Sequence, residues 1–207
     1  MEAEFYGANC IRLRGKKTSI VIDDYKQDKG EIITKPGDIA VFTKGHDKEI
    51  KSTFTVERPG EYEVSDVSIQ GISARSHMDT EEEKTSVIYR LIINDFRVAV
   101  TGHIYPDLSE QQLESIGMID VLFVPVGGNG YTLDAVGALK VIKKIGPSIV
   151  VPTHYAAKGI KYEVPQADLA EVRKILSMEP VEELDQLKLK SREFTEGTKL
   201  VILKNSL

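Results

Sequence analysis

The arrangement of apolar runs along the chain is the feature that most limits its fold. Before residue 75 these runs are short, rich in β-branched and aromatic residues, and separated by Gly, Pro, Asp or Lys turns. After residue 105, segments with helical periodicity alternate with apolar runs of strand length, and further strand-like runs close the chain. This order predicts an α/β (α+β) protein with two sheets packed face to face and helices outside, because the helices are too few to cover one long parallel sheet on both sides.

The predicted strands cover residues 3–7, 10–15, 18–23, 38–42, 52–57, 61–64, 67–74, 85–94, 96–102, 119–126, 148–154, 186–191 and 198–204. Asn94 and Asp95 come between two of them and suit a tight hairpin turn. No break in composition marks a domain boundary. Residues 1–207 are therefore expected to form one domain around one core.

The predicted helices cover residues 109–117, 132–146 and 165–177. Ser109 and Gln112 form a capping box at the start of the first helix. Thr132 is expected to cap the second helix, which carries Lys143 and Lys144 in its last turn. Pro165 is expected near the first turn of the third helix.

Composition limits the partners of the chain. The formal net charge is −5 and no basic stripe is present, which argues against nucleic acid. No run of about 18 apolar residues could span a bilayer, and no signal-peptide segment begins the sequence, so a cytoplasmic location is expected. The single cysteine, Cys10, cannot form an intrachain disulfide and is expected to be a buried apolar residue. The expected partner is a small-molecule substrate, and a homo-oligomer is left open.

The sequence has four histidines, and each follows an apolar, strand-like run: His46, His77, His103 and His154. Loops that leave the same edge of a layered β structure converge in space, so the four imidazoles could meet there. Imidazole is the commonest nitrogen ligand of zinc, and three or four such groups can bind one ion tetrahedrally. Spacing alone leaves open both a shared site and four separate hydrogen-bonded loop residues.

Four segments carry a resemblance to a known family: "GANCIRLRGKKTSIVID", "ERPGEYEVSDVSIQGI", "DVLFVPVGGNGYTLDA" and "PSIVVPTHY". Together they resemble the metallo-β-lactamase superfamily, in particular its compact branch of metal-dependent hydrolases similar to the ascorbate-phosphate lactonase group. The resemblance covers nearly the whole chain. It implies a four-layer αββα sandwich, with two mixed β-sheets and an active site at one edge between the sheets.

The family's HxHxDH motif corresponds to "TKGHDKE" in this chain. The correspondence keeps His46 at the second histidine position. It places Lys44 at the first, Lys48 at the aspartate and Glu49 at the last. Asp23 matches the structural aspartate that supports the metal loop in the family.

The other ligand positions of the family are better preserved. His77 in "ARSHMD" fits the isolated histidine, and His154 in "PTHY" fits the last one. The bridging aspartate, which usually follows glycine, is replaced by His103 in "TGHI". The metal motif is therefore degenerate.

These changes argue against two metal ions. Two ions about 3.5–4 Å apart need a bridging anionic ligand, and a protonated lysine repels a cation. We therefore expect one ion, zinc or another divalent transition metal, held by histidines from the set His46, His77, His103 and His154. Glu49, Asp47 and Lys44 are the candidate catalytic residues, with either acid as an additional oxygen ligand. If three protein groups bind the ion, an open position could hold a water that attacks an ester, lactone or phosphoester. If all four histidines bind it, the site is closed and structural.

The alternative is that no metal binds. Lys44 or Lys48 would then stand in place of the cation and pair with Glu49, Asp47 or an anionic ligand. Such a protein would be a non-catalytic (pseudoenzyme) binding or interaction protein on the same fold.

A glycine-rich segment, "VPVGGNGYTLDA" at residues 124–135, runs from a strand into a helix. It matches neither the P-loop nor the dinucleotide-binding pattern. In the family that the chain resembles, this loop borders the active site, which makes Asn129 and Tyr131 candidates for substrate contact.

Overall fold

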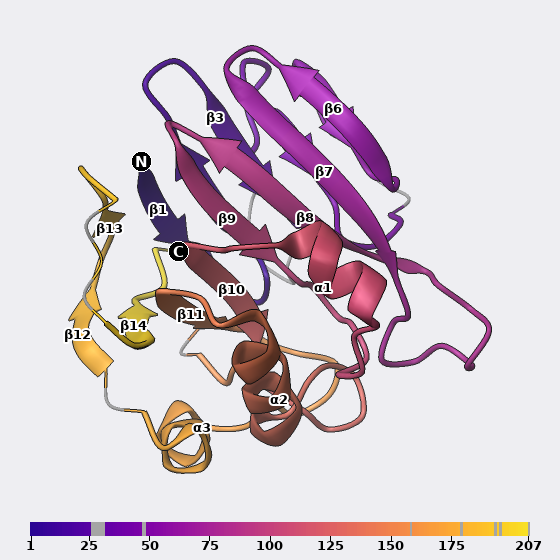
Figure 1. Ribbon diagram of the computed structural model, residues 1–207, viewed down its shortest axis with the longest axis vertical. Coiled ribbons are helices and arrows are strands. Elements are labelled where there is room, and N and C mark those ends of the chain that lie inside the picture. The colour runs from indigo at the N-terminus through magenta and orange to yellow at the C-terminus, as the bar shows by residue number, and fades with distance from the viewer. Residues whose placement is uncertain are drawn as a thin grey trace.

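The computed structural model (Figure 1) describes residues 1–25, 32–46, 49–157, 159–178, 180–192, 194 and 196–206. Within these residues the strands form one sheet of six strands and one of eight, both mixed. Their inward side chains belong to one hydrophobic core, to which the first sheet contributes Phe5 and Leu13 and the second contributes Leu91 and Phe123. The predicted fold class of two packed mixed sheets is confirmed.

The smaller sheet has the strand order β13-β1-β2-β3-β4-β5. Its strands are β1 (Glu2–Phe5), β2 (Ile11–Arg14), β3 (Ser19–Ile22), β4 (Ile39–Val41), β5 (Phe54–Val56) and β13 (Leu187–Lys188). Strand β3 pairs in parallel with β4, and β4 pairs in parallel with β5, whereas the other pairs are antiparallel.

The larger sheet has the strand order β12-β14-β11-β10-β9-β8-β7-β6. Its strands are β6 (Gly60–Val64), β7 (Val67–Ala74), β8 (Ser86–Ile93), β9 (Phe96–Val100), β10 (Val121–Pro125), β11 (Ile149–Thr153), β12 (Pro180–Leu184) and β14 (Lys199–Leu203). Strands β8 and β9 are joined by Asn94 and Asp95, both with positive φ, as expected for the predicted two-residue hairpin turn.

Strand β12 is absent from the predicted strands. Its sequence, "PVEEL", starts with proline and contains two consecutive acids, which are residues depleted in strands. In the structure it pairs only with β14 at the edge of the sheet. Proline and charged residues are tolerated on edge strands, because one side of the strand makes no ladder hydrogen bonds.

The three helices are α1 (Glu110–Ile116), α2 (Ala135–Ile145) and α3 (Leu169–Leu176). All three lie in connections between strands of the larger sheet, and α1 and α2 lie across its strands in Figure 1. Ser109 and Gln112 form the predicted capping box of α1. The helices of the described residues are too short to cross a membrane.

The predicted starts of the other two helices are wrong by two or more residues. Asp134, not Thr132, caps α2, and its carboxylate accepts a hydrogen bond from the backbone N–H of Gly137. Helix α3 begins at Leu169 after its cap Asp168 rather than near Pro165. Both true caps are aspartates, whose side chains are among the strongest acceptors for the free N–H groups of a first turn.

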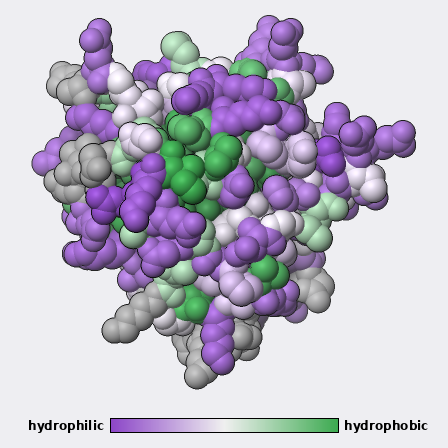
Figure 2. Space-filling model, turned by 90° about the horizontal axis from the view of Figure 1, so that it is seen from below, coloured by the Kyte–Doolittle hydropathy of each residue, from purple (hydrophilic) through white to green (hydrophobic). Residues whose placement is uncertain are grey.

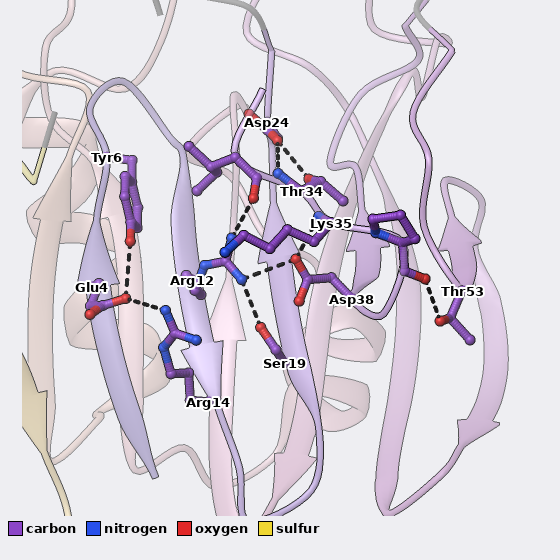
Figure 3. Close-up of polar contacts among 12 residues, drawn as sticks. Glu4, Tyr6, Arg12, Arg14, Ser19, Asp24, Thr34, Lys35, Asp38 and Thr53 are labelled. Carbon is purple, nitrogen blue, oxygen red and sulfur yellow. Dashed lines mark hydrogen bonds and ion pairs between the residues drawn. The ribbon is translucent and has the colours of Figure 1, made fainter. Parts of the chain in front are cut away.

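A buried polar network covers the outer face of the smaller sheet (Figure 3). The guanidinium of Arg12, on β2, donates to Ser19 Oγ at 3.0 Å, to Asp38 Oδ2 at 3.0 Å and to the backbone oxygen of Ile33 at 2.5 Å. Asp38 also accepts from the backbone N–H of Lys35 at 2.8 Å. Arg12 therefore holds the segment before β4 against the sheet.

The carboxyl ends of the strands define one edge of the sandwich. Strands β9, β10 and β11 are parallel, so the loops that follow them leave on the same side. At this edge the two sheets are connected, because Lys44 forms an isolated bridge with Ser86 and the N–H of Val87 donates to Thr43 O at 2.8 Å. Figure 2 shows the molecule from below Figure 1, where a cluster of hydrophobic atoms is surrounded by hydrophilic side chains.

Candidate active site

His103 and His154 form the centre of the candidate site. Their ring centroids are 4.7 Å apart and the ring planes are nearly perpendicular. His103 follows β9 and is 7% exposed, and His154 follows β11 and is 5% exposed. The structure thus brings together two of the four candidate ligands, which follow the two strands on either side of β10.

Two tyrosine rings flank this histidine pair. The ring centroid of Tyr131 lies 4.8 Å from that of His103 and 5.7 Å from that of His154. The ring centroid of Tyr162 lies 4.9 Å from that of His154, and the hydroxyl of Tyr162 donates to the backbone oxygen of Tyr155. Both imidazoles therefore lie close to the ring of Tyr131, and His154 also lies close to that of Tyr162.

His154 is held in one orientation and one protonation state. Its Nδ1 lies 2.9 Å from Gln166 Oε1, and Gln166 Nε2 donates to the carbonyl oxygen of Val164 at 2.7 Å. A carbonyl can only accept, so the Gln166 oxygen must face His154, and Nδ1 carries the proton. Burial lowers the pKa of His154 to about 4. At neutral pH its Nε2 therefore carries a lone pair.

The backbone also holds His154 in place. Its φ is +53°, an unusual value for a residue other than glycine, and its N–H donates to Ala8 O at 2.7 Å. Such conformations persist only where the surrounding structure stabilises them, and they concentrate at functional sites.

His103 is neutral for related reasons. Burial lowers the pKa of His103 well below its ordinary value, and His154, Lys44 and His77 lower it further. Its Nε2 lies 3.1 Å from Asn9 Nδ2, and its Nδ1 is buried with no hydrogen-bond partner within the described part of the chain.

The other two histidines make different contacts. The N–H of His77 donates to His103 O at 2.8 Å, but its ring lies 5.9 Å from that of Tyr105. The ring of His46 lies against that of Phe42 at a tilt of 41°, with 3.8 Å between centroids, and His46 Nε2 lies 3.6 Å from a carboxylate oxygen of Glu57. The predicted meeting of all four imidazoles stays a prediction beyond the observed pair.

The three candidate catalytic residues, Lys44, Glu49 and Asp47, differ in how the structure places them. Lys44 is half-buried, and its positive charge helps to lower the pKa of His103. Its backbone oxygen accepts from the hydroxyl of Tyr25 at 2.8 Å. Glu49 is exposed. Asp47 and the neighbouring Lys48 lie outside the described residues.

Asp23 supports the loop that contains Lys44. It is fully buried, and its carboxylate accepts from the N–H of Thr43 at 2.7 Å and from its hydroxyl at 2.6 Å. Burial raises the pKa of Asp23 to about 6, although the hydrogen bonds from Thr43 act in the opposite direction. These contacts are those expected of a residue that buttresses the loop after β4.

The glycine-rich loop after β10 contributes through Tyr131 rather than Asn129. Asn129 is exposed, and its side chain donates to the backbone oxygen of Pro165. A Cβ on Gly127 would lie 2.0 Å from both Gln166 Oε1 and His154 O. A glycine is therefore required at residue 127 for the loop that carries Gln166 to reach the histidine pair.

The residues around the histidine pair meet only part of the needs of a metal ion. Among the described residues, no three His, Cys, Asp or Glu side chains are placed to hold one together. Two neutral imidazoles with an available ring nitrogen match the chemistry of a zinc ligand, which must be deprotonated. The pair fits part of the coordination shell of one ion and does not fit a two-ion site, which needs a bridging anion.

Three site residues escaped the sequence analysis: Asn9, Tyr162 and Gln166. All three lie in loops of the structure. Asn9 falls in a segment that carries the family resemblance and Gln166 falls in the predicted helix 165–177, but neither pattern assigns them to the site. Their contacts with the histidine pair depend on loop conformation, which the sequence pattern does not specify.

Comparison with known proteins identifies the family. The profile described as the β-lactamase superfamily domain matches residues 2–154, from the first strand through the last histidine. The chain belongs to the β-lactamase superfamily. The predicted resemblance to its metallo branch is confirmed, because a candidate Zn-dependent hydrolase of the metallo-β-lactamase superfamily from Thermotoga maritima has the same fold. The TM-score is 0.77, the identity 25%, and the match covers 98% of each chain.

Two sequence relatives agree with this superfamily assignment. A UPF0173 protein of Pyrococcus abyssi is 28% identical over 183 residues, which cover 77% of this chain and 85% of the relative. A UPF0173 metal-dependent hydrolase of Thermoplasma acidophilum is 23% identical over 184 residues, covering 73% and 81%.

Proposed function

We propose that this β-lactamase superfamily member is a metal-dependent hydrolase with a reduced site for one divalent ion, zinc or another transition metal, and that it acts on a small ester, lactone or phosphoester. The observation that carries the proposal is the contact between His103 and His154, two buried and neutral imidazoles at the edge of the sandwich. The description of the Thermoplasma relative as a metal-dependent hydrolase supports it.

His103 and His154 would hold the ion, with His77, His46 or Asp47 completing its ligands. When bound, such an ion supplies Lewis-acid activation of water and of a carbonyl or phosphoryl group. Gln166 orients His154 through Nδ1, and the rings of Tyr131 and Tyr162 exclude water from the pair.

Lys44 is proposed to bind the negative charge of the substrate. Burial and His154 lower the pKa of His103, the imidazole that would hold the ion, and the ammonium of Lys44 adds to that effect. Charge placed where it develops in the transition state is one of the largest contributions to catalysis. Glu49 and Asp47 stay candidate catalytic residues. The proposed partner is a small-molecule substrate; the absence of nucleic-acid and membrane partners, the cytoplasmic location and a homo-oligomer stay predictions.

The second candidate function is a non-catalytic binding protein, and Lys44 is the observation that favours it. A lysine charge near enough to affect His103 could take the place of a metal charge and attract an anionic ligand directly. Under this reading the two histidines act as hydrogen-bonding groups and no ion is needed.

Metal analysis combined with turnover separates the two candidates. Tag-free protein, reconstituted with zinc, nickel, manganese or iron, is expected to retain close to one equivalent of an ion and to hydrolyse a member of a phosphodiester, lactone and thioester panel. The variants His103→Ala and His154→Ala should lose both properties. Glu114→Gln, on the exposed side of α1, is the control and should retain both.

Each candidate function can also be rejected by a specific result. Retention of well under one equivalent of every metal after reconstitution would remove the proposed hydrolase and leave the binding protein. Turnover that disappears in folded His77→Ala and His154→Ala would rule against the binding protein.

A further inference from the structure

The backbone of His154 has a conformation that needs support from the residues around it. Its φ is +53°, in the left-handed region that residues other than glycine seldom adopt. On the N-terminal side, the N–H of His154 donates to Ala8 O at 2.7 Å. The carbonyl of His154 packs against Gly127, where a Cβ would lie 2.0 Å from the oxygen. These contacts hold His154 itself, and the chain that follows it needs a separate support.

Tyr162 contacts the chain that follows His154. Its hydroxyl donates to the backbone oxygen of Tyr155, the next residue, at 2.8 Å. Burial raises the pKa of Tyr162 to about 12, so the hydroxyl keeps its proton and stays a donor at neutral pH. The backbone of Ala8 acts on this pKa in the opposite direction, which places Ala8 beside the same hydroxyl. The hydroxyl of Tyr162 therefore lies where the two backbone neighbours of His154 meet.

The same side chain also lies against the imidazole. The ring centroids of Tyr162 and His154 are 4.9 Å apart, with 47° between the ring planes. The hydroxyl and the ring of Tyr162 belong to one planar group, so they cannot move independently. Tyr162 thus connects the backbone after His154 to the imidazole of His154.

The direction of this imidazole determines its other contacts. Its Nδ1 lies 2.9 Å from Gln166 Oε1, and its ring centroid lies 4.7 Å from that of His103. A change of φ at residue 154 would turn the imidazole away from both partners. Left-handed backbone in residues other than glycine persists only where the surrounding structure stabilises it.

We propose that Tyr162 is a positioning residue, whose hydroxyl holds the chain after His154 so that His154 keeps its left-handed backbone and its imidazole stays beside His103. The proposal concerns the geometry of the pair and applies whether the pair binds an ion or a hydrogen-bonding ligand. Only its consequence for metal binding rests on the proposed function.

Backbone chemical shifts report φ at residue 154 in the natural protein, without a variant that must fold. In isotope-labelled protein with no added metal, the signals of His154 are assigned from the sequence of backbone connections. We expect the shifts of a left-handed residue. Shifts that correspond to an ordinary negative φ overturn the proposal.

Tyr162→Phe tests the hydroxyl, because it keeps the ring beside His154 and removes only the donor. The backbone shifts of His154 should move toward those of negative φ, and its ring nitrogen signals should change as Nδ1 loses Gln166. The ring signals of His46, which packs on Phe42, are the internal reference and should stay unchanged.

Tyr155→Phe is the matched control. The hydroxyl of Tyr155 donates to Leu203 O at 3.1 Å, and its ring stacks on that of Phe5 with 5.7 Å between centroids. This variant also loses one hydrogen bond from a tyrosine to a backbone oxygen, so it should lower the thermal stability without changing the signals of His154. Unchanged His154 signals in Tyr162→Phe, or equal changes in both variants, overturn the proposal.

Zinc binding measures what this positioning contributes to the proposed function. By titration calorimetry with Zn²⁺ alone, Tyr162→Phe should bind about 10-fold more weakly than the natural protein, and Tyr155→Phe should bind equally well. If His154 depends on Tyr162 and the natural protein binds no zinc, the metal-dependent function fails and the role of Tyr162 stands. If the protein binds zinc and His154 is unchanged in Tyr162→Phe, the role of Tyr162 fails and the function stands.

Discussion

The hydroxyl of Thr43 lies so close to Gly102 that a Cβ atom on Gly102 would be 2.3 Å from Thr43 Oγ1. Thr43 cannot move away easily, because its N–H and hydroxyl both donate to the buried carboxylate of Asp23. Gly102 directly precedes His103. The aspartate at the end of β3 is therefore connected to the histidine pair by contact through Thr43 and Gly102.

Gly102→Ala should destabilise the fold. The new methyl group meets Thr43, and φ at residue 102 is +60°, which is unfavourable for alanine. We expect a loss of about 2–4 kcal/mol in the free energy of unfolding, measured by chemical denaturation. Gly37→Ala is the control, since a Cβ there has no atom within 4 Å and the change should be within about 0.5 kcal/mol. Equal stability of the two variants would contradict the close contact.

Asp23 should make stability depend on pH in an unusual direction for a carboxylate. Burial raises its pKa from the ordinary 3.8 to about 6, so the folded state holds a proton that the unfolded state releases. The stability that this group contributes is present below pH 3.8 and is lost as pH rises through about 6. The loss is about 3 kcal/mol for a shift of about two pKa units.

Asp23→Asn provides the comparison for this pH effect. The amide does not ionise, so the difference in unfolding free energy between the natural protein and the variant should fall between pH 4 and 6.5. Any constant effect of the substitution leaves this slope unchanged. A difference that is flat or rises with pH would show that the Asp23 pKa is not raised.

Much of the fold was predictable from local pattern. Alternating apolar residues gave nearly all the strands, and Asn94 with Asp95 gave a hairpin turn that needs two positive φ angles. Strand β12 was missed because an edge strand needs little apolar surface. Residues 180–184 form a strand because they pair with β14, and this long-range pairing is not visible in the local sequence.

The candidate site was predictable only in part. All four histidines follow strands, so the pattern could not distinguish the pair in contact from the two that face other partners. What joins His103 to His154 is the conformation of the loops, including the positive φ of His154 and the hydrogen bond that it makes to Ala8. Such features depend on long-range contacts.

The start of helix α2 offers a direct test of a corrected prediction. Asp134→Ala removes the carboxylate that caps Gly137 N and should cost about 1 kcal/mol. Thr132 is fully buried, and its hydroxyl has no hydrogen-bond partner in the described structure. Thr132→Val keeps the shape and removes that hydroxyl, so it should be neutral or stabilising in thermal unfolding. Destabilisation by Thr132→Val larger than that by Asp134→Ala would favour the sequence-based cap.

The buried ion pair of Arg12 and Asp38 should be far more important to stability than the exposed pair beside it. The side chains of Arg12 and Asp38 are each less than a tenth exposed. Those of Arg14 and Glu4 are 43% and 22% exposed. Arg12→Met leaves a buried carboxylate without its cation and should cost about 3–5 kcal/mol of unfolding free energy. Arg14→Met is the matched control and should cost less than about 1 kcal/mol.

A double-mutant cycle tests whether the loss of stability in Arg12→Met comes from the unpaired, buried carboxylate of Asp38. The combination of Arg12→Met with Asp38→Leu removes both charges, so it should be less destabilising than the sum of the single changes. If the two effects simply add, Asp38 is not the partner that Arg12 needs. In that case the bonds from Arg12 to Ser19 and to the backbone of Ile33, rather than the ion pair, would hold the segment before β4 on the sheet.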